Sequence, residues 1–253
     1  MKLVTTSQMR AIEKEADSKG VSYAQMMLNA GRGLAEVTHA IGQENGWDGV
    51  TGIVGSGNNG GDTLVALTWL AEAGWHTHAY LVNRTITGDD LVANYLEAGG
   101  EIALFANDKD LASLRNFLED SDLLLDGLLG TGIKLPLRNE AALVLQGVAS
   151  ILVDLELTPL IVAVDCPSGV DCDTGACADE TLPADLTITM AAVKQGLLKL
   201  PAFEYVGELE CVEIGLPENL DSWNGLHMEV ADLEMVSAYL PERTLASHKG
   251  TFG

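Results

Sequence analysis

Apolar residues along the chain repeat with two different periods, and the alternation of these periods predicts the fold class. Helical spacing of apolar residues occurs in the segments 6–19, 23–41, 63–74, 89–98, 111–118 and 141–155. Short apolar runs typical of strands lie between or after them, at 50–54, 76–82, 101–105, 122–126, 160–165, 186–190 and 207–214. Continuous apolar strands between helices indicate a parallel sheet that is covered on both faces. The pattern therefore predicts an α/β fold, a Rossmann-like three-layer αβα arrangement with a mostly parallel central sheet and N-terminal helices.

Length and charge narrow the classes of function. The chain has 253 residues, 47% of them hydrophobic, which is enough for one large domain. The formal charge of −23, from 37 acidic and 14 basic residues, argues against a nucleic-acid partner, because such binding requires clustered Lys and Arg. No apolar run reaches the roughly 18 residues of a membrane span. Residues 1–20 contain no apolar segment of the kind found in signal peptides. We therefore expect a cytoplasmic protein that does not bind membranes and that acts on a small molecule.

Cysteine and histidine spacing does not indicate a transition-metal site. The cysteines fit neither a Cys-x-x-Cys pair nor a zinc ribbon and are expected to be reduced thiols: Cys166, Cys172, Cys177 and Cys211. His76 and His78 share one face of a predicted strand, and an ordinary strand face is the better interpretation of that pair.

The run 55–62, Gly-Ser-Gly-Asn-Asn-Gly-Gly-Asp, directly follows a predicted strand and is the most informative segment. We expect a phosphate-binding loop, since glycines allow positive φ and a close approach of backbone N–H groups to phosphate oxygens. The match to Gly-x-Gly-x-x-Gly is by itself a weak signal. The second strand leads into Asn83 and Arg84, where an NAD-binding Rossmann unit places an acid for the ribose. Either the ligand carries a further phosphate that meets Arg84, or the loop serves a ligand other than a dehydrogenase cofactor.

Three polar, glycine-containing loops follow three of the predicted strands. They span 58–62, 126–132 and 165–169, and Asp126 and Asp165 both end apolar strands. Ligands of open parallel sheets bind outside the carboxyl ends of the strands. Each loop alone is also compatible with an ordinary turn. Together they predict one functional site at this edge of the sheet.

Five motifs in series resemble those of the NAD(P)H-hydrate epimerases, the YjeF N-terminal domain family. They are found at 27–31, 58–62, Asp126 with 130–132, 164–171, and 184–189 with Lys194 and Gly196. Their order and spacing match across nearly the whole chain. Three positions depart from the usual pattern: Leu28 where Glu is common, Thr63 where many members have Gly, and Cys166 where Ile is usual.

The resemblance implies a substrate, a reaction and a metal ion. The substrate is NADH or NADPH hydrated on its reduced ring, and the reaction interconverts its R and S epimers. By motif position the substrate-binding residues are Asn58, Asn59, Gly60, Gly61, Asp62, Gly130, Thr131, Gly132, Ile133, Lys134, Leu135, Pro136 and Asp165. A potassium ion (K+) is implied at Asn59, Asp126 and Ser168, all of which offer the oxygen donors that a hard cation prefers.

The chemistry of the substrate suggests candidate catalytic residues. The nitrogen lone pair of the ring expels hydroxide and leaves a planar iminium that water re-attacks from either face. Asp165 is the candidate that exchanges a proton with this oxygen, and Lys134 or Lys194 is the alternative proton source. A free Asp has a pKa of about 3.9, so protonation of Asp165 would require burial. Asp165 could instead hold the ribose hydroxyls without taking part in the chemistry.

The end of the chain has its own resemblance. Residues 247–253, Ser-His-Lys-Gly-Thr-Phe-Gly, look like the beginning of the ADP- or ATP-dependent NAD(P)H-hydrate dehydratase domain of bifunctional bacterial enzymes. We therefore assign 1–240 to the epimerase domain and 241–253 to a linker and the start of a truncated dehydratase domain. The expected partner is that C-terminal domain, and these 253 residues are expected to epimerise the hydrates but not to dehydrate them.

Two other function classes remain open at this point. The same fold occurs fused to RNA-processing proteins as a module that binds nucleotides without turnover. The charge of −23 and the intact set of Asn59, Asp126, Asp165 and Ser168 disfavour that class. An NADP-dependent dehydrogenase that uses Arg84 lacks an evident site for a hydride substrate. The apolar N-terminal helices outside the sheet are candidates for a homo-oligomer face.

Overall fold

A parallel sheet of seven strands forms the centre of the computed structural model, which describes residues 1–231, 233–240, 248 and 250. Along the sheet the strands are β4 (Glu101–Leu104), β3 (His76–Leu81), β2 (Gly49–Val54), β5 (Leu123–Gly127), β6 (Leu160–Val164), β7 (Leu186–Met190) and β9 (Glu208–Val212). Every neighbouring pair in this sheet is parallel. All seven strands predicted from the apolar runs are present, with ends that differ by at most two residues.

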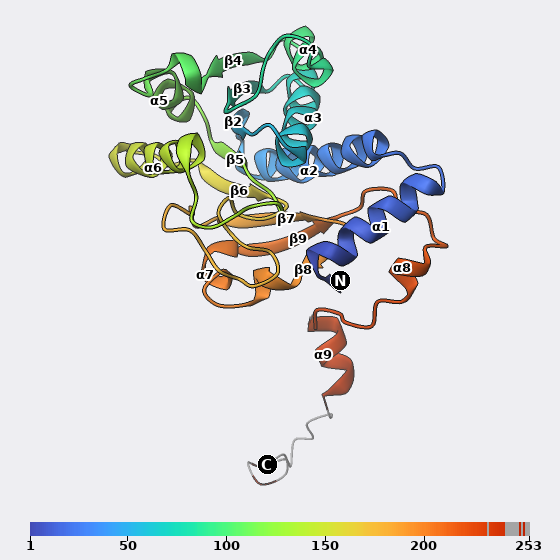
Figure 1. Cartoon of the computed structure of the whole chain (residues 1–253). Coiled ribbons are helices and arrows are strands. Elements are labelled where there is room, and N and C mark those ends of the chain that lie inside the picture. The colour runs from blue at the N-terminus through green and yellow to red at the C-terminus, as the bar shows by residue number, and fades with distance from the viewer. Residues whose placement is uncertain (232, 241–247, 249, 251–253) are drawn as a thin grey trace.

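Helices cover both faces of the sheet (Figure 1). One face carries α2 (Tyr23–Asn45), α3 (Asn58–Glu72) and α4 (Asp90–Glu97), and the other carries α5 (Ala112–Glu119) and α6 (Asn139–Asp154). Alternate residues of the central strands enter the two cores: Leu123 and Leu125 pack on the α2–α3 side, whereas Leu124 packs on the α5–α6 side. The three-layer αβα prediction is confirmed.

The N-terminal segment adds a helix and a small second sheet beside the main one. Helix α1 (Thr6–Ser18) begins at a capping box between Thr5 and Gln8 and buries Met9, Ile12 and Ala16. Before it, β1 (Leu3–Val4) pairs in parallel with β8 (Val193–Lys194). Two residues are too few to show a period, so the apolar pattern did not predict this pair.

Several short elements were also outside the prediction, for the same reason of length. They are η1 (Phe105–Asn107), η2 (Gln195–Leu198), α7 (Phe203–Val206), α8 (Asp221–Asn224) and α9 (Leu233–Tyr239). In the part of the chain that the structure describes, no helix is long and apolar enough to cross a membrane. The predicted linker at 241–253 lies outside the described residues apart from His248 and Gly250, and it stays a prediction.

The run 55–62 differs from the predicted loop. Helix α3 begins at Asn58, with Gly57 as its N-cap, and not at residue 63. None of the four glycines in the run has a positive φ. Instead, a β-carbon on Gly60 would lie 1.9 Å from the carbonyl oxygen of Gly55. Glycine is needed here because the first turn of α3 packs directly on the preceding backbone, not because the chain turns sharply.

This packing predicts the effect of a small added side chain. Gly60→Ala should lower the free energy of unfolding by about 1–3 kcal/mol, because overpacking against rigid backbone outweighs the roughly 1 kcal/mol that Ala gains over Gly in a helix. Urea denaturation followed by circular dichroism measures the change. The matched control is Gly57→Ser, since no atom lies within 4 Å of a β-carbon there and Ser is a favoured N-cap. Equal stability of Gly60→Ala and the wild type would contradict this account of the glycine.

Candidate functional site

A cavity of about 690 Å³ opens where the carboxyl ends of β2, β5 and β6 meet the first turn of α3. Helices α1 and α2 form its opposite wall. The three loops predicted to share one edge of the sheet all contribute to it. The predicted substrate-binding residues that line it are Asn58, Asn59, Asp62, Gly130, Thr131, Gly132, Ile133 and Asp165.

The other predicted substrate residues do not line the cavity. Gly60 and Gly61 lie inside the packed first turn of α3, and Gly61 faces the thioether of Met27. Lys134 and Pro136 are exposed, and Leu135 is half-buried outside the cavity. The cavity lining that continues from Gly130 therefore ends at Ile133, and Lys134 is not among the lining residues.

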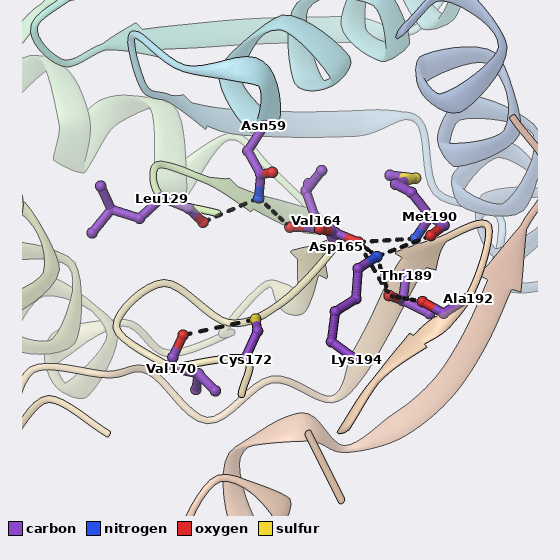
Figure 2. Close-up of polar contacts among 10 residues, drawn as sticks. All are labelled: Asn59, Leu129, Val164, Asp165, Val170, Cys172, Thr189, Met190, Ala192 and Lys194. Carbon is purple, nitrogen blue, oxygen red and sulfur yellow. Dashed lines mark hydrogen bonds and ion pairs between the residues drawn. The ribbon is translucent and has the colours of Figure 1, made fainter. Parts of the chain in front are cut away.

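Asp165 and Lys194 form a buried ion pair at the floor of the cavity (Figure 2). Asp165 follows β6 directly, at a φ of +65°, in the left-handed region that Asp tolerates better than most residues. Its backbone N–H donates to the carbonyl of Ile188 at 2.8 Å. Its Oδ1 accepts from the N–H of Met190 at 3.0 Å and from the hydroxyl of Thr189 at 3.1 Å. The end of β7 therefore fixes this carboxylate.

All three N–H donors of Lys194 are used. They go to Asp165 Oδ1, to the carbonyl of Met190 at 2.9 Å and to Thr189 Oγ1 at 3.2 Å. Burial alone lowers the pKa of Lys194, but the charge and hydrogen bond of Asp165 outweigh burial and raise the pKa above its usual value. Lys194 is therefore an ammonium whose protons are all bound within the protein.

Two further carboxyl groups line the same cavity. Asp62, just after the first turn of α3, is 7% exposed, and within the described residues its carboxyl makes no hydrogen bond. Burial raises its pKa well above the usual value; Asp165 and Glu13 add to this effect, and Lys194 opposes it. Glu13, on α1, is half-buried, and burial likewise raises its pKa, with Lys194 and Arg10 acting in the opposite direction. The cavity thus contains an ion pair together with two acids whose pKa is raised by burial.

Two of the three predicted potassium ligands, Asp126 and Ser168, are in direct contact, and Asn59 is linked to them through Leu129. Asp126 accepts hydrogen bonds from the Ser168 hydroxyl at 2.6 Å and from the Ser168 N–H at 2.8 Å. The amide nitrogen of Asn59 donates to the carbonyls of Leu129 at 3.0 Å and Val164 at 2.5 Å (Figure 2). The Oδ1 atom of Asn59 remains available as an acceptor. A β-carbon on residue 130 would lie 2.3 Å from this atom, which explains why residue 130 is a glycine.

The chemistry of this cluster fits a monovalent cation. Asp126 is 1% exposed, and no described Lys, Arg or His side chain forms an ion pair with it. Burial raises the pKa of Asp126 against the opposing hydrogen bonds from Ser168 and Leu128. A cation held by the oxygens of Asn59, Asp126 and Ser168 would offset that buried charge.

Helices α1 and α2 supply lining residues that the sequence analysis did not identify. They are Thr6, Met9, Arg10, Glu13, Tyr23, Ala24, Met26, Met27 and Ala30. Only Met27 and Ala30 fall in a motif that had been noted. Arg10 and Glu13 carry opposite charges, are three residues apart and lie beside the buried residues of α1. This spacing is the one local feature of the sequence that could have identified them as lining residues.

Other candidate residues have structural partners. Arg84 donates to Asp89 at 2.8 Å and to the carbonyl of Gly55 at 3.1 Å, and it does not line the cavity. The four cysteines are free, as predicted. Among the described residues no group of three or more His, Cys, Asp or Glu side chains is arranged to hold a metal ion.

The three departures from the family pattern leave the cavity intact. Thr63 turns toward the sheet, where its hydroxyl donates to the carbonyl of Asn59 at 2.7 Å. The thiol of Cys166 is buried, and a hydrogen bond with Cys172 raises its pKa well above the usual value. Leu28 is 48% exposed on α2. None of the three lines the cavity.

Comparison with known proteins identifies the family to which the sequence is similar. The family model described as "YjeF-related protein N-terminus" matches residues 23–196. An NAD(P)H-hydrate epimerase of Clavibacter michiganensis is 36% identical over 196 residues, which cover 76% of this chain and 83% of that protein. The bifunctional NAD(P)H-hydrate repair enzyme Nnr of Moorella thermoacetica is 31% identical over 260 residues, which cover 100% of this chain and 48% of that enzyme. The chain thus spans about half the length of the bifunctional relative.

A solved structure supports the fold. The crystal structure of the yeast protein ynu0 superimposes with a TM-score of 0.65 at 21% sequence identity, over 83% of this chain and 87% of the yeast chain. The matched family model spans most of the chain and contains every predicted site residue. The chain therefore belongs to the family of proteins with a YjeF-related N-terminus.

Proposed function

We propose that this protein is an epimerase that interconverts the R and S forms of hydrated NADH and NADPH. The observation that carries the proposal is one cavity that combines the N-terminus of a helix with a buried Asp165–Lys194 pair. The relatives named NAD(P)H-hydrate epimerase support the choice of substrate. The bifunctional relatives support a C-terminal dehydratase domain as the partner in a longer protein.

The first turn of α3 suits the phosphate part of a dinucleotide. Ser56, Gly57 and Asn58 line the cavity where α3 begins. The first N–H groups of a helix have no partner within the helix, and the helix dipole favours an anion there. In this arrangement the pyrophosphate binds at α3, and the nicotinamide ring lies toward Asp165.

Asp165 provides negative charge where the substrate becomes positive. When the oxygen leaves, the ring turns into an iminium cation, and a preorganised carboxylate stabilises developing positive charge in a site that excludes water. Lys194, Met190 and Thr189 all bind Oδ1, so Oδ2 is the atom of Asp165 that remains available to the substrate or to water. Asp165 is accordingly suited to stabilise the cation and to accept a proton from the returning water.

Potassium is the ion proposed for the Asn59–Asp126–Ser168 cluster. When bound, it supplies positive charge that offsets the carboxylate of Asp126. Ser168 already connects Asp126 to the loop after β5, because its hydroxyl accepts from the N–H of Leu129 at 2.9 Å. The ion would therefore stabilise the loops that line the cavity.

The direct test of the proposed function is chromatographic separation of the two hydrate epimers. A mixture enriched in one epimer should reach equilibrium faster with the protein than without it. Absorbance in the reduced-nicotinamide band should stay unchanged with candidate hydride substrates. Dinucleotide binding without faster equilibration would instead support a binding module.

Asp165→Asn should remove catalysis and also destabilise the fold. We expect the rate to fall by about 10²- to 10⁴-fold, the range typical of acid–base groups. The free energy of unfolding should fall by about 3–5 kcal/mol, because Lys194 is left as a buried charge without a counter-ion. Epimerisation assays and urea denaturation measure the two effects.

A double variant separates these two roles of Asp165. In Asp165→Asn with Lys194→Met both charges are absent, so stability should recover toward the wild type while the rate stays low. A stable double variant with a normal rate would show that Asp165 has no part in the chemistry.

Potassium should raise the melting temperature more than a bulky organic cation does at equal ionic strength. Binding to the native state alone adds RT ln(1 + [L]/Kd), about 2.7 kcal/mol at a hundredfold excess over Kd. Asp126→Asn should abolish the potassium-specific part of the shift, because it removes the charge that the ion offsets. Identical melting curves of the wild type in the two cations would argue against the site.

A further inference from the structure

We propose that Asp62 is the catalytic acid of this site and delivers a proton to the oxygen that leaves the ring. The inference rests on the proposed epimerase function and goes beyond it, because that function identifies a stabilising anion but no proton donor. Asp62 lines the cavity from the fifth residue of α3, just after its first turn. Asp165 lines it from the end of β6, so the two carboxyls reach the same space from different elements.

The three proton donors considered from the sequence, which are two lysines and Asp165, are excluded by their surroundings. Lys194 has all three N–H groups bound to protein oxygens, and Lys134 is exposed outside the cavity. Asp165 lies in an ion pair with Lys194, and its Oδ1 already accepts from Lys194, Thr189 and Met190. A group that must give up a proton at the start of the reaction cannot be the carboxylate of an ion pair.

Asp62 has the opposite environment. Its side chain is buried, yet within the described residues it has no hydrogen-bond partner and no cationic partner within ion-pair distance. The enclosed side-chain atoms without a hydrogen-bond partner among the described residues are His78 Nδ1 and Thr181 Oγ1, so the carboxyl oxygens of Asp62 are open to the cavity that it lines. A hydroxyl group on a substrate bound in the cavity offers Asp62 a hydrogen-bond partner.

The charges around Asp62 hold its proton in the resting site. Asp165 at the end of β6 and Glu13 on α1 oppose its ionisation, whereas Lys194 on β8 favours it; Arg10 on α1 acts on Glu13. Burial and these two carboxyls raise the pKa of Asp62 well above its usual value. When the ring becomes a cation, the new positive charge favours ionisation of Asp62. The surroundings thus disfavour the carboxylate of Asp62 before the reaction, and the cation that the reaction creates favours it.

The proposed steps balance in atoms and charge. The O–H proton of Asp62 moves to the hydroxyl oxygen of the substrate, the C–O bond breaks with its electron pair on the departing water, and the nitrogen lone pair forms the C=N⁺ bond. Water then adds to the other face through an oxygen lone pair, and the C=N⁺ pair returns to nitrogen. Oδ2 of Asp165 takes the proton that this water loses. After product release, proton exchange with solvent restores the neutral Asp62 and the ionised Asp165.

Asp62→Asn tests the proposal, because it keeps the shape of the neutral acid but has no proton to transfer. We expect kcat for epimerisation to fall about 10²- to 10⁴-fold, with a dinucleotide Kd within a few-fold of the wild type. In the wild type, kcat should fall as pH rises through the titration of Asp62, and this fall should be absent from the residual activity of the variant. The matched control is Glu13→Gln, which removes the other neutral-favouring carboxyl and should reduce kcat much less.

Stability provides a readout independent of activity. An acid whose pKa is raised in the folded state binds more protons there than in the unfolded state, so the wild type loses stability as pH rises above about 4. Asp62→Asn has no such loss. The melting temperature of the variant minus that of the wild type should therefore increase with pH, starting near zero at about pH 3.

The outcomes separate this inference from the proposed function. A wild-type protein without epimerase activity overturns the function and the inference with it. An active wild type combined with an unchanged kcat and a raised KM in Asp62→Asn overturns the inference alone and makes Asp62 a binding residue. A larger loss in Glu13→Gln than in Asp62→Asn assigns the proton to Glu13 and also overturns it.

Discussion

The close packing of the first turn of α3 on the backbone around it is the constraint from which the site follows. Gly55 and Gly60 bring the helix against the end of β2, and Gly130 accommodates the side chain of Asn59. A β-carbon on any of the three would meet another atom at 2.3 Å or less. This approach places Asn59 between the loops after β5 and β6, and it places Asp62 beside the cavity. Positioning on a helix packed against a sheet holds these side chains more firmly than a mobile loop would.

The second feature that determines the site is the sharp turn at the end of β6. Asp165 leaves the strand in the left-handed region, and Met190 at the end of β7 and Lys194 on β8 hold its carboxylate. Strands β7 and β8 therefore hold the backbone of Asp165 in place and bind its carboxylate. Since a buried ion pair contributes little net stability, its retention at the cavity floor is better explained by the chemistry of the site.

Apolar periodicity was sufficient for the sheet and its covering helices, because each of these elements is long enough to repeat. It placed the start of α3 too late, since glycines have low helix propensity and the packing that favours the helix is not visible locally. It also missed β8, a strand of two residues, so Lys194 was identified by its motif and not by its position in the fold. Lys134 was expected at the site because its motif continues past Gly132, whereas the chain leaves the cavity after Ile133.

One wall of the cavity comes from α1, which lies before residue 23, where the match to the family model begins. Arg10 and Glu13 on this helix face the cavity, and the helix itself is tied to the rest of the protein by Asp173, which accepts from the N–H of Thr6 at 2.8 Å. The matched family model thus covers the cavity floor and the part of the opposite wall that α2 forms, but not α1. Substitutions on α1 can change which dinucleotide fits while the chemistry beneath it is preserved, so divergence of substrate preference among relatives should be sought first in this helix.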